Sequence, residues 1–224
     1  MACNNQPATP ANDAASGATA PADTPSRSTL RFGFGNRFLT WDPHQEQRPV
    51  TLMGYQLVYD ALLTEDSTGQ LLPGLAIEWA QQIDTVELTL REGVVFHDGT
   101  PFDAEVARAN LLHARNEGAP AIAQQLLAVD SIDVLDPYRI RLNLAAPVPD
   151  LLSNLARSAG MMISPEAFAT AAEQPVGTGP GFLMPMSQHQ MCNMSLMLFP
   201  ISGIRSNRVS NVLCYWYCPM LRHG

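Results

Sequence analysis

The sequence predicts an α+β fold, in which a mixed sheet built from β-hairpins is flanked by helices. Residues 85–90 alternate apolar and polar side chains, which is the period of a strand with one buried face. Residues 132–144 repeat this alternation on both sides of an Asp-Pro turn, which predicts a hairpin. Residues 104–115 place apolar side chains at helical spacing directly after Asp103, whose carboxylate can cap a helix.

Further elements are expected around these three. Residues 29–35 read as the first strand, and the apolar stripe of residues 50–63 predicts a helix. A second helix is expected at 120–128, because Pro in a first helical turn leaves no hydrogen bond unmade. Asp150 and Ser164 each precede a short apolar run and are predicted N-caps of two short helices.

Five motifs follow one another in an order that is specific to one family. They are TWDPH (40–44), LPGLAIEW (72–79), LREGVVFHDGTPFDAE (90–105), GMMISPEAF (160–168) and VGTGP (176–180). In this order they resemble the family 5 extracytoplasmic solute-binding proteins, the peptide- and nickel-type substrate-binding subunits of ATP-binding-cassette (ABC) importers. The resemblance covers about residues 29–180, and several spaced motifs are more specific than a single one.

The resemblance implies a fold and a function. The expected fold is a partial first lobe of a type II periplasmic binding protein, with residues 29–180 as the N-terminal lobe and the second lobe absent. Such a protein captures a small solute and delivers it to a membrane permease, with neither an enzymatic activity nor a cofactor. GMMISP resembles the peptide-like branch and favours oligopeptides, while nickel stays open. The loop after the first strand leads toward the ligand cleft, so Asn36, Arg37 and Trp41 are the expected ligand contacts.

Residues 1–28 are expected to form a disordered tether, because they contain few bulky apolar side chains and are rich in Pro, Ala, Ser and Thr. Cys3 follows a small residue and precedes this tether, as in the lipoproteins of the resembled family. We therefore expect lipidation at Cys3, an extracytoplasmic location and membrane contact only through the lipid anchor. The residues before Cys3 include no signal region, so this location requires a signal peptide that precedes them.

The composition changes after residue 180. All 21 acidic residues precede residue 174, whereas residues 181–224 have none and hold three of the four cysteines. This shift predicts a frame-shifted or truncated tail, and hence a form deficient in ligand binding. The alternative is a small zinc-stabilised interaction module that uses soft ligands in this tail. Its ligands would be His189, Cys192, Cys214 and Cys218.

Composition and spacing also exclude several functions. A net charge of −8 argues against a nucleic-acid surface, which needs clustered positive charge. Gly33 and Gly35 lack the third glycine of a dinucleotide fingerprint. His97 lies in a motif that the resemblance treats as structural, and His44 and His113 read as isolated histidines, so we expect no catalytic site.

Overall fold

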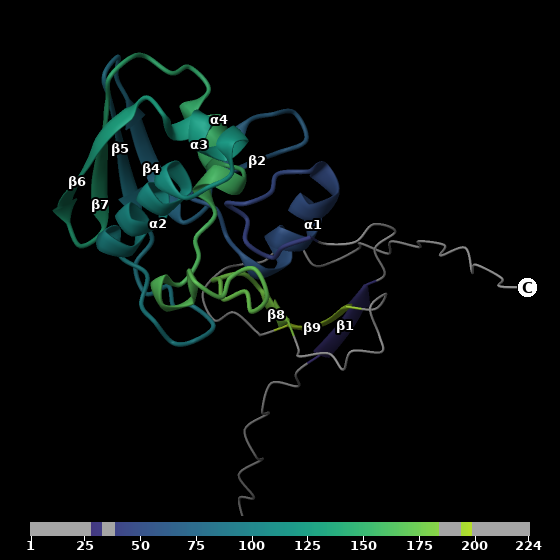
Figure 1. Ribbon diagram of the computed structural model, residues 1–224. Coiled ribbons are helices and arrows are strands. Elements are labelled where there is room, and N and C mark those ends of the chain that lie inside the picture. Colours follow the sequence, from purple (N-terminus) through teal and green to yellow (C-terminus); the bar gives the residue numbers. More distant parts are fainter. Residues whose placement is uncertain (1–27, 33–38, 184–193, 199–224) are drawn as a thin grey trace, which may run out of the picture.

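The computed structural model describes residues 28–32, 39–183 and 194–198 of the chain (Figure 1). The described strands and helices follow one another in a mixed order. In chain order they are β1 (Ser28–Phe32), α1 (Pro49–Val58), β2 (Leu63–Glu65), β3 (Leu71–Pro73), β4 (Ala76–Gln81), β5 (Thr85–Leu90), α2 (Ala104–Asn116), α3 (Pro120–Leu126), β6 (Val129–Asp136), β7 (Arg139–Leu144), α4 (Leu151–Leu155), the 3₁₀ turns η1 (Ser158–Gly160) and η2 (Pro165–Ala167), β8 (Gly181–Leu183) and β9 (Met194–Leu198).

A four-stranded antiparallel sheet in the order β4-β5-β7-β6 forms the largest layer. The predicted strand at 85–90 is confirmed as β5, and Val86, Leu88 and Leu90 all point into the core. The predicted hairpin is confirmed as β6 and β7, whose register pairs Ile132 with Leu142. The alternation of the sequence thus places one apolar face inward on each inner strand.

Helices α2 and α3 and the short α4 cover the apolar face of this sheet (Figure 1). The predicted helix after Asp103 is confirmed, and the Asp103 carboxylate accepts a hydrogen bond of 2.9 Å from the N–H of Val106. Leu111 lies on the inner side of α2 and is fully buried, as is Ile122 of α3. A second, smaller core around Tyr55 lies beside α1.

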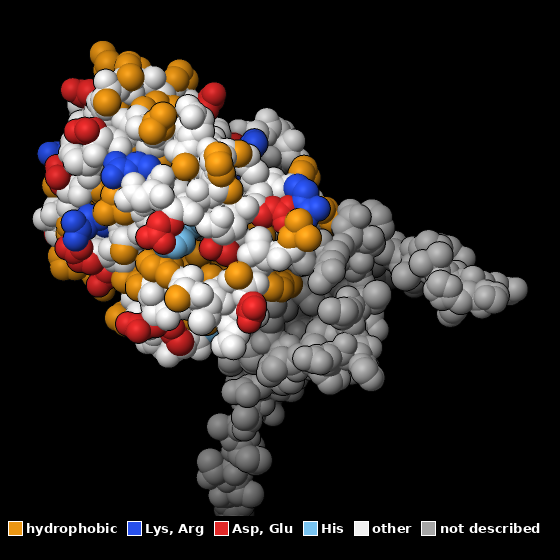
Figure 2. Space-filling model, in the orientation of Figure 1, with side chains coloured by type: hydrophobic (Ala, Val, Ile, Leu, Met, Phe, Trp, Pro, Cys, Tyr) orange, Lys and Arg blue, Asp and Glu red, His pale blue; other side chains and the backbone are white. Residues whose placement is uncertain are grey.

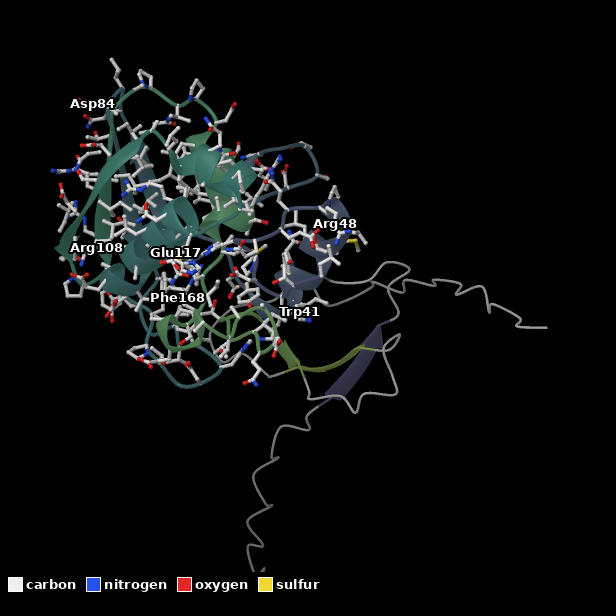
Figure 3. The ribbon with its side chains drawn as sticks, viewed as in Figure 1. Trp41, Arg48, Asp84, Arg108, Glu117 and Phe168 are labelled. Carbon is white, nitrogen blue, oxygen red and sulfur yellow. The ribbon has the colours of Figure 1, made fainter. Side chains whose placement is uncertain are left out.

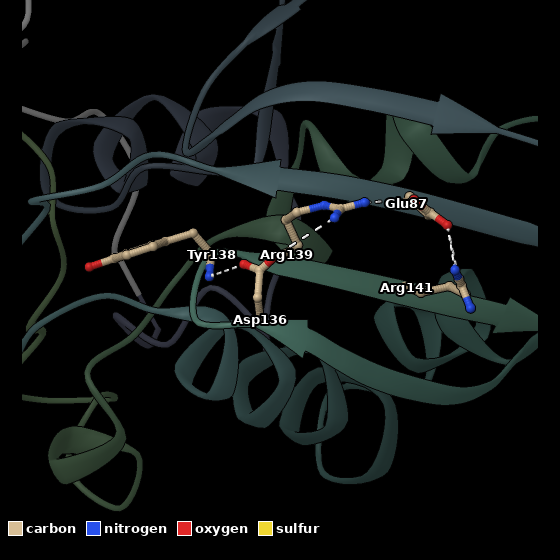
Figure 4. A network of polar contacts seen from close by, with 5 residues as sticks. All are labelled: Glu87, Asp136, Tyr138, Arg139 and Arg141. Carbon is tan, nitrogen blue, oxygen red and sulfur yellow. Dashed lines mark hydrogen bonds and ion pairs between the residues drawn. The ribbon is translucent and has the colours of Figure 1, made fainter.

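The opposite face of the sheet is polar and carries a network of charged side chains (Figure 4). Both Arg139 and Arg141 reach Glu87 on the neighbouring strand, at 3.3 Å and 2.7 Å respectively. Arg139 also lies 3.7 Å from Asp136, whose carboxylate accepts the N–H of Tyr138 in the hairpin turn. This face is therefore a solvated surface held in register by pairs across the strands.

Two smaller sheets complete the described fold. Strands β2 and β3 form an antiparallel pair. β1 pairs with β9 and β8 also pairs with β9, so the order is β1-β9-β8. β1 confirms the first predicted strand as far as Phe32. The domain boundary expected at residue 180 stays a prediction, as do the tether and the tail, whose residues lie largely outside the described ranges.

The helix expected over 50–63 is wrong at its end, because α1 stops at Val58. Beyond it, backbone groups bond to segments far along the chain: the N–H of Leu62 donates to Gly160, and the carbonyl of Val58 accepts from Gly179. These partners hold Tyr59 in an extended conformation. The apolar stripe continues to residue 63 in the sequence, but these tertiary contacts end the helix at Val58.

Both predicted short-helix caps are also wrong, although elements do begin after them. Asp150 has φ −91° and ψ 6°, outside the extended conformation in which a side chain caps a helix, and it makes no capping bond. Ser164 precedes a single 3₁₀ turn, and its hydroxyl donates instead to the Asp98 carboxylate at 2.5 Å.

Candidate ligand-facing site

Trp41 lies on the partly exposed edge of the smaller core, beside α1 (Figure 3). Its ring meets that of Tyr55 edge to face, with 6.2 Å between the ring centroids. The backbone N–H of Trp41 donates to the carbonyl of Ala172 at 3.0 Å, and the Tyr55 hydroxyl donates to the carbonyl of Thr40. Trp41 is thus held at a defined place on the surface. The other two expected contacts, Asn36 and Arg37, lie outside the described residues.

Asp42 and His44 are buried directly behind Trp41. One oxygen of the Asp42 carboxylate accepts the N–H of His44 at 2.8 Å, and burial raises the pKa of this carboxyl above its ordinary value. The His44 imidazole lies between the carbonyl of Met161, at 3.0 Å, and the Nδ1 of His113, at 3.1 Å. Complete burial, together with the charge of His113, lowers the pKa of His44 to about 3.

The expectation that His44 and His113 are isolated is therefore wrong. They lie far apart in the sequence, yet their rings contact each other, and His113 also stacks on Phe168 with 4.4 Å between ring centroids. No fixed spacing marks such a pair. The one signal in the sequence is Asp42, two residues before His44. An Asp at this spacing can accept the N–H of the later residue and so form a turn, which here directs the backbone inward.

His97 joins two of the motifs that carry the family resemblance. Its Nδ1 accepts the N–H of Gly177 at 3.3 Å, so its Nε2 donates to the carbonyl of Gly179 at 2.8 Å. Nearby, the hydroxyl of Thr178 donates to the half-buried carboxylate of Asp60 at 3.0 Å. Burial lowers the pKa of His97, which favours the neutral ring that these bonds require. Both nitrogens of His97 thus hold the VGTGP loop.

Gly179 permits this close packing. A Cβ at that position would lie 2.6 Å from the carbonyl carbon of Val58. The carbonyl of Val58 in turn accepts the N–H of Gly179 at 2.9 Å. The loop therefore packs its glycines against the end of α1.

A shallow groove of about 410 Å³ runs along α2 and is lined by a few apolar residues and by the ion pair of Glu105 with Arg108. Its lining comprises Glu105, Val106, Arg108, Ala109, Leu112 and Pro165. Arg108, which lines this groove, is well separated from Trp41 in Figure 3. On the face shown in Figure 2, acidic and basic side chains are interspersed.

Within the described part of the chain, no cluster of three or more His, Cys, Asp or Glu side chains could hold a metal ion. The zinc ligands proposed as an alternative, His189, Cys192, Cys214 and Cys218, lie outside these residues, as does Cys3. No helix among the described residues is long and apolar enough to span a bilayer.

The sequence of residues 70–181, half of the chain, matches the profile of the bacterial extracellular solute-binding proteins, family 5. The chain belongs to this family. The matched residues include both motifs joined by His97, which confirms the expected family relationship. The family consists of binding proteins and not of enzymes.

Individual members of the family are similar over a limited length. The glutathione-binding protein GsiB of Salmonella paratyphi A is 31% identical over 153 residues, which are 65% of this chain and 30% of that protein. GsiB of Escherichia coli is 30% identical over the same number of residues. The chain thus spans 30% of the length of these curated relatives.

Solved structures of solute-binding proteins share the fold. NikA from Brucella suis, in complex with Fe(III)-EDTA, superposes with a TM-score of 0.60 at 26% identity and covers 70% of this chain and 33% of that one. An ABC transporter substrate-binding protein from Sinorhizobium meliloti gives 0.55 at 30% identity, covering 69% and 32%. The expected periplasmic-binding-protein-like fold is therefore confirmed.

Proposed function

We propose that this family 5 chain belongs to the substrate-binding component of an ABC importer, which captures a small solute outside the cytoplasmic membrane and presents it to a membrane permease. The observation that carries the proposal is the family match over residues 70–181. In such a protein no covalent chemistry is needed, because selectivity comes from polar groups that a wrong ligand leaves unpaired. We propose Trp41 as one wall of the ligand site, since it is the expected contact that lies within the described residues.

We propose short peptides as the ligand class. The curated relatives are named for binding glutathione, which is itself a tripeptide, and the GMMISP segment also favours peptides. Metal complexes are the competing class, because the Brucella suis structure holds Fe(III)-EDTA. Trp41 suits either class, since an aromatic face packs on the apolar parts of a peptide and of a chelate alike.

Binding by this chain is expected to be weak. The described residues supply one proposed wall of the site, at Trp41, and a ligand enclosed by fewer walls buries less surface. We expect a dissociation constant of about 1 mM, which corresponds to about −4 kcal/mol and lies within the range of a titration to about 10 mM ligand. Tight peptide binding in isothermal titration calorimetry would contradict this expectation.

The test is a titration of the 224-residue chain with glutathione, trialanine and the nickel complex of L-histidine, followed by Trp fluorescence. We expect glutathione and trialanine to change the emission of the wild type and of Trp79→Phe, but not of Trp41→Phe. Trp79 is a matched control because it lies on β4, away from the smaller core. A response to the nickel complex alone would replace the peptide class by metal chelates, and no response to any ligand would refute the proposal.

A further inference from the structure

The segment Thr40–Arg48 is attached to the body of the protein through His44 at its centre. The His44 side chain is completely buried, and the backbone carbonyl of His44 accepts the N–H of Ala119 at 2.8 Å. Its imidazole bridges Met161 and His113, as described above. Trp41 belongs to the same segment, so the position of its ring depends on these contacts.

The hydrogen-bond partners determine where the protons lie. The carbonyl of Met161 can only accept, so the Nε2 of His44 must donate to it. The Nδ1 of neutral His44 is then a bare acceptor, and the Nδ1 of His113 must donate to it. This leaves the Nε2 of His113 without a proton, 3.7 Å from the carboxylate of Glu117.

This arrangement can accept one proton but not two. A first proton can lie on the Nε2 of His113, where it faces Glu117 and breaks no hydrogen bond. A second proton would have to lie on the Nδ1 of His44, where it faces the N–H of His113. Two donors and two positive charges would then meet at a buried site, which breaks the contact.

The other charged and titratable groups nearby do not relieve this conflict. The Asp42 carboxylate accepts the backbone N–H of His44 and attracts a positive charge on His113, so it favours the first proton on His113 and does not face the Nδ1 of His44. Burial and the charge of Asp42 both raise the pKa values of Tyr55 and Tyr59 on α1. At the end of the segment Arg48 pairs with Glu46 at the surface. Burial keeps the pKa of His44 near 3, far below that of a histidine in water.

We propose that the His44–His113 pair is a pH-dependent anchor, which holds the Thr40–Arg48 segment and Trp41 against the body when the pair carries at most one proton and releases the segment when His44 is also protonated. Release takes up one proton at His44. The ratio of anchored to released segment should therefore fall about tenfold per pH unit below about pH 6.5. This inference does not depend on the identity of the solute.

Hydrogen exchange followed by mass spectrometry tests the proposal on the full chain. After correction for the intrinsic rates, amides of residues 41–48 should exchange about fiftyfold faster at about pH 4.5 than at about pH 6.5. Amides of β5 and β7 in the same sample report global unfolding, and they should change much less. Equal acceleration of the sheet and the segment, or no acceleration of the segment, would overturn the proposal.

Three variants separate the anchor from other effects of acid. His44→Gln removes the titrating group but retains a donor for Met161, so the acid response of the segment should disappear. His113→Gln should reduce the response, because an amide can turn over and accept from protonated His44. His97→Gln alters a half-buried histidine outside the segment and should leave the response unchanged. Persistence of the full response in His44→Gln, or its loss in His97→Gln alone, would contradict the assignment.

Discussion

Replacement of Asn110 by Leu should destabilise the fold strongly, because it removes two buried hydrogen bonds at once. Asn110 is completely buried on α2. Its Nδ2 donates to the carbonyl of Ile163 at 2.9 Å, and its Oδ1 accepts the N–H of Ile163 at 2.8 Å. Leu fills a similar volume but makes neither bond, so both backbone groups of Ile163 would remain buried and unpaired.

The magnitude follows from these two groups. A buried backbone group left without a partner costs about 1–3 kcal/mol, so two of them cost about 4 kcal/mol together. With a urea dependence of about 2 kcal/mol per molar, the midpoint of unfolding should fall by about 2 M. Urea titration followed by far-ultraviolet circular dichroism measures this shift at a fixed pH.

The matched control is Asn143→Leu on the polar face of the sheet. Asn143 bonds to the side chains of Ser131 and Asp133, both at the surface, so its loss leaves no buried group unpaired. Its midpoint should stay within the change of about 0.5 kcal/mol that is usual for surface sites. If Asn110→Leu and Asn143→Leu shift the midpoint equally, the assignment of the Ile163 bonds as stabilising is refuted.

Three further predictions use the same assay. Burial raises the pKa of Asp60, so the native state binds this proton more tightly than the unfolded state does and loses stability as pH rises through the native pKa. Asp60→Asn should therefore be more stable than wild type at pH 7, with a difference that shrinks toward pH 4. A constant or reversed difference would contradict this. Gly179→Ala should lower the midpoint more than Gly99→Ala, because the added Cβ meets the Val58 backbone, whereas at Gly99 the space is open and only the strain of a side chain at φ +88° is added; equal losses would contradict the packing argument. Glu87→Gln should leave the midpoint unchanged at low and high salt, because its arginine pairs are exposed; a loss at low salt would show otherwise.

The inner strands and α2 could be predicted because their burial is periodic along the sequence. β5 buries every second residue, and α2 has a working cap at Asp103. The edge strand β4 was not predicted, because only its first residue, Ala76, is buried and its sequence shows no alternation. The end of α1 could not be predicted either, since its backbone partners, such as Gly160, lie far along the chain.

The candidate site also has features that the sequence could predict and features that it could not. Each ring nitrogen of His97 bonds to the VGTGP loop, which agrees with the structural role that the family motifs indicate, while the expected lack of a catalytic role stays a prediction. The pairing of His44 with His113 could not be predicted, because it depends on how the TWDPH segment turns onto α2. The ligand contact at Trp41 stays a prediction that the fluorescence titration can test.

The pairing of β1 with β9 has a kinetic consequence. β1 lies near the start of the chain, whereas its partner is made last among the described strands, with Ser28 opposite Leu198. Until that partner is available, the backbone groups of β1 have none of the hydrogen bonds of this ladder. Because contacts between distant segments form slowly, closure of this sheet should be a late step of folding, after the hairpin of β6 and β7 has formed.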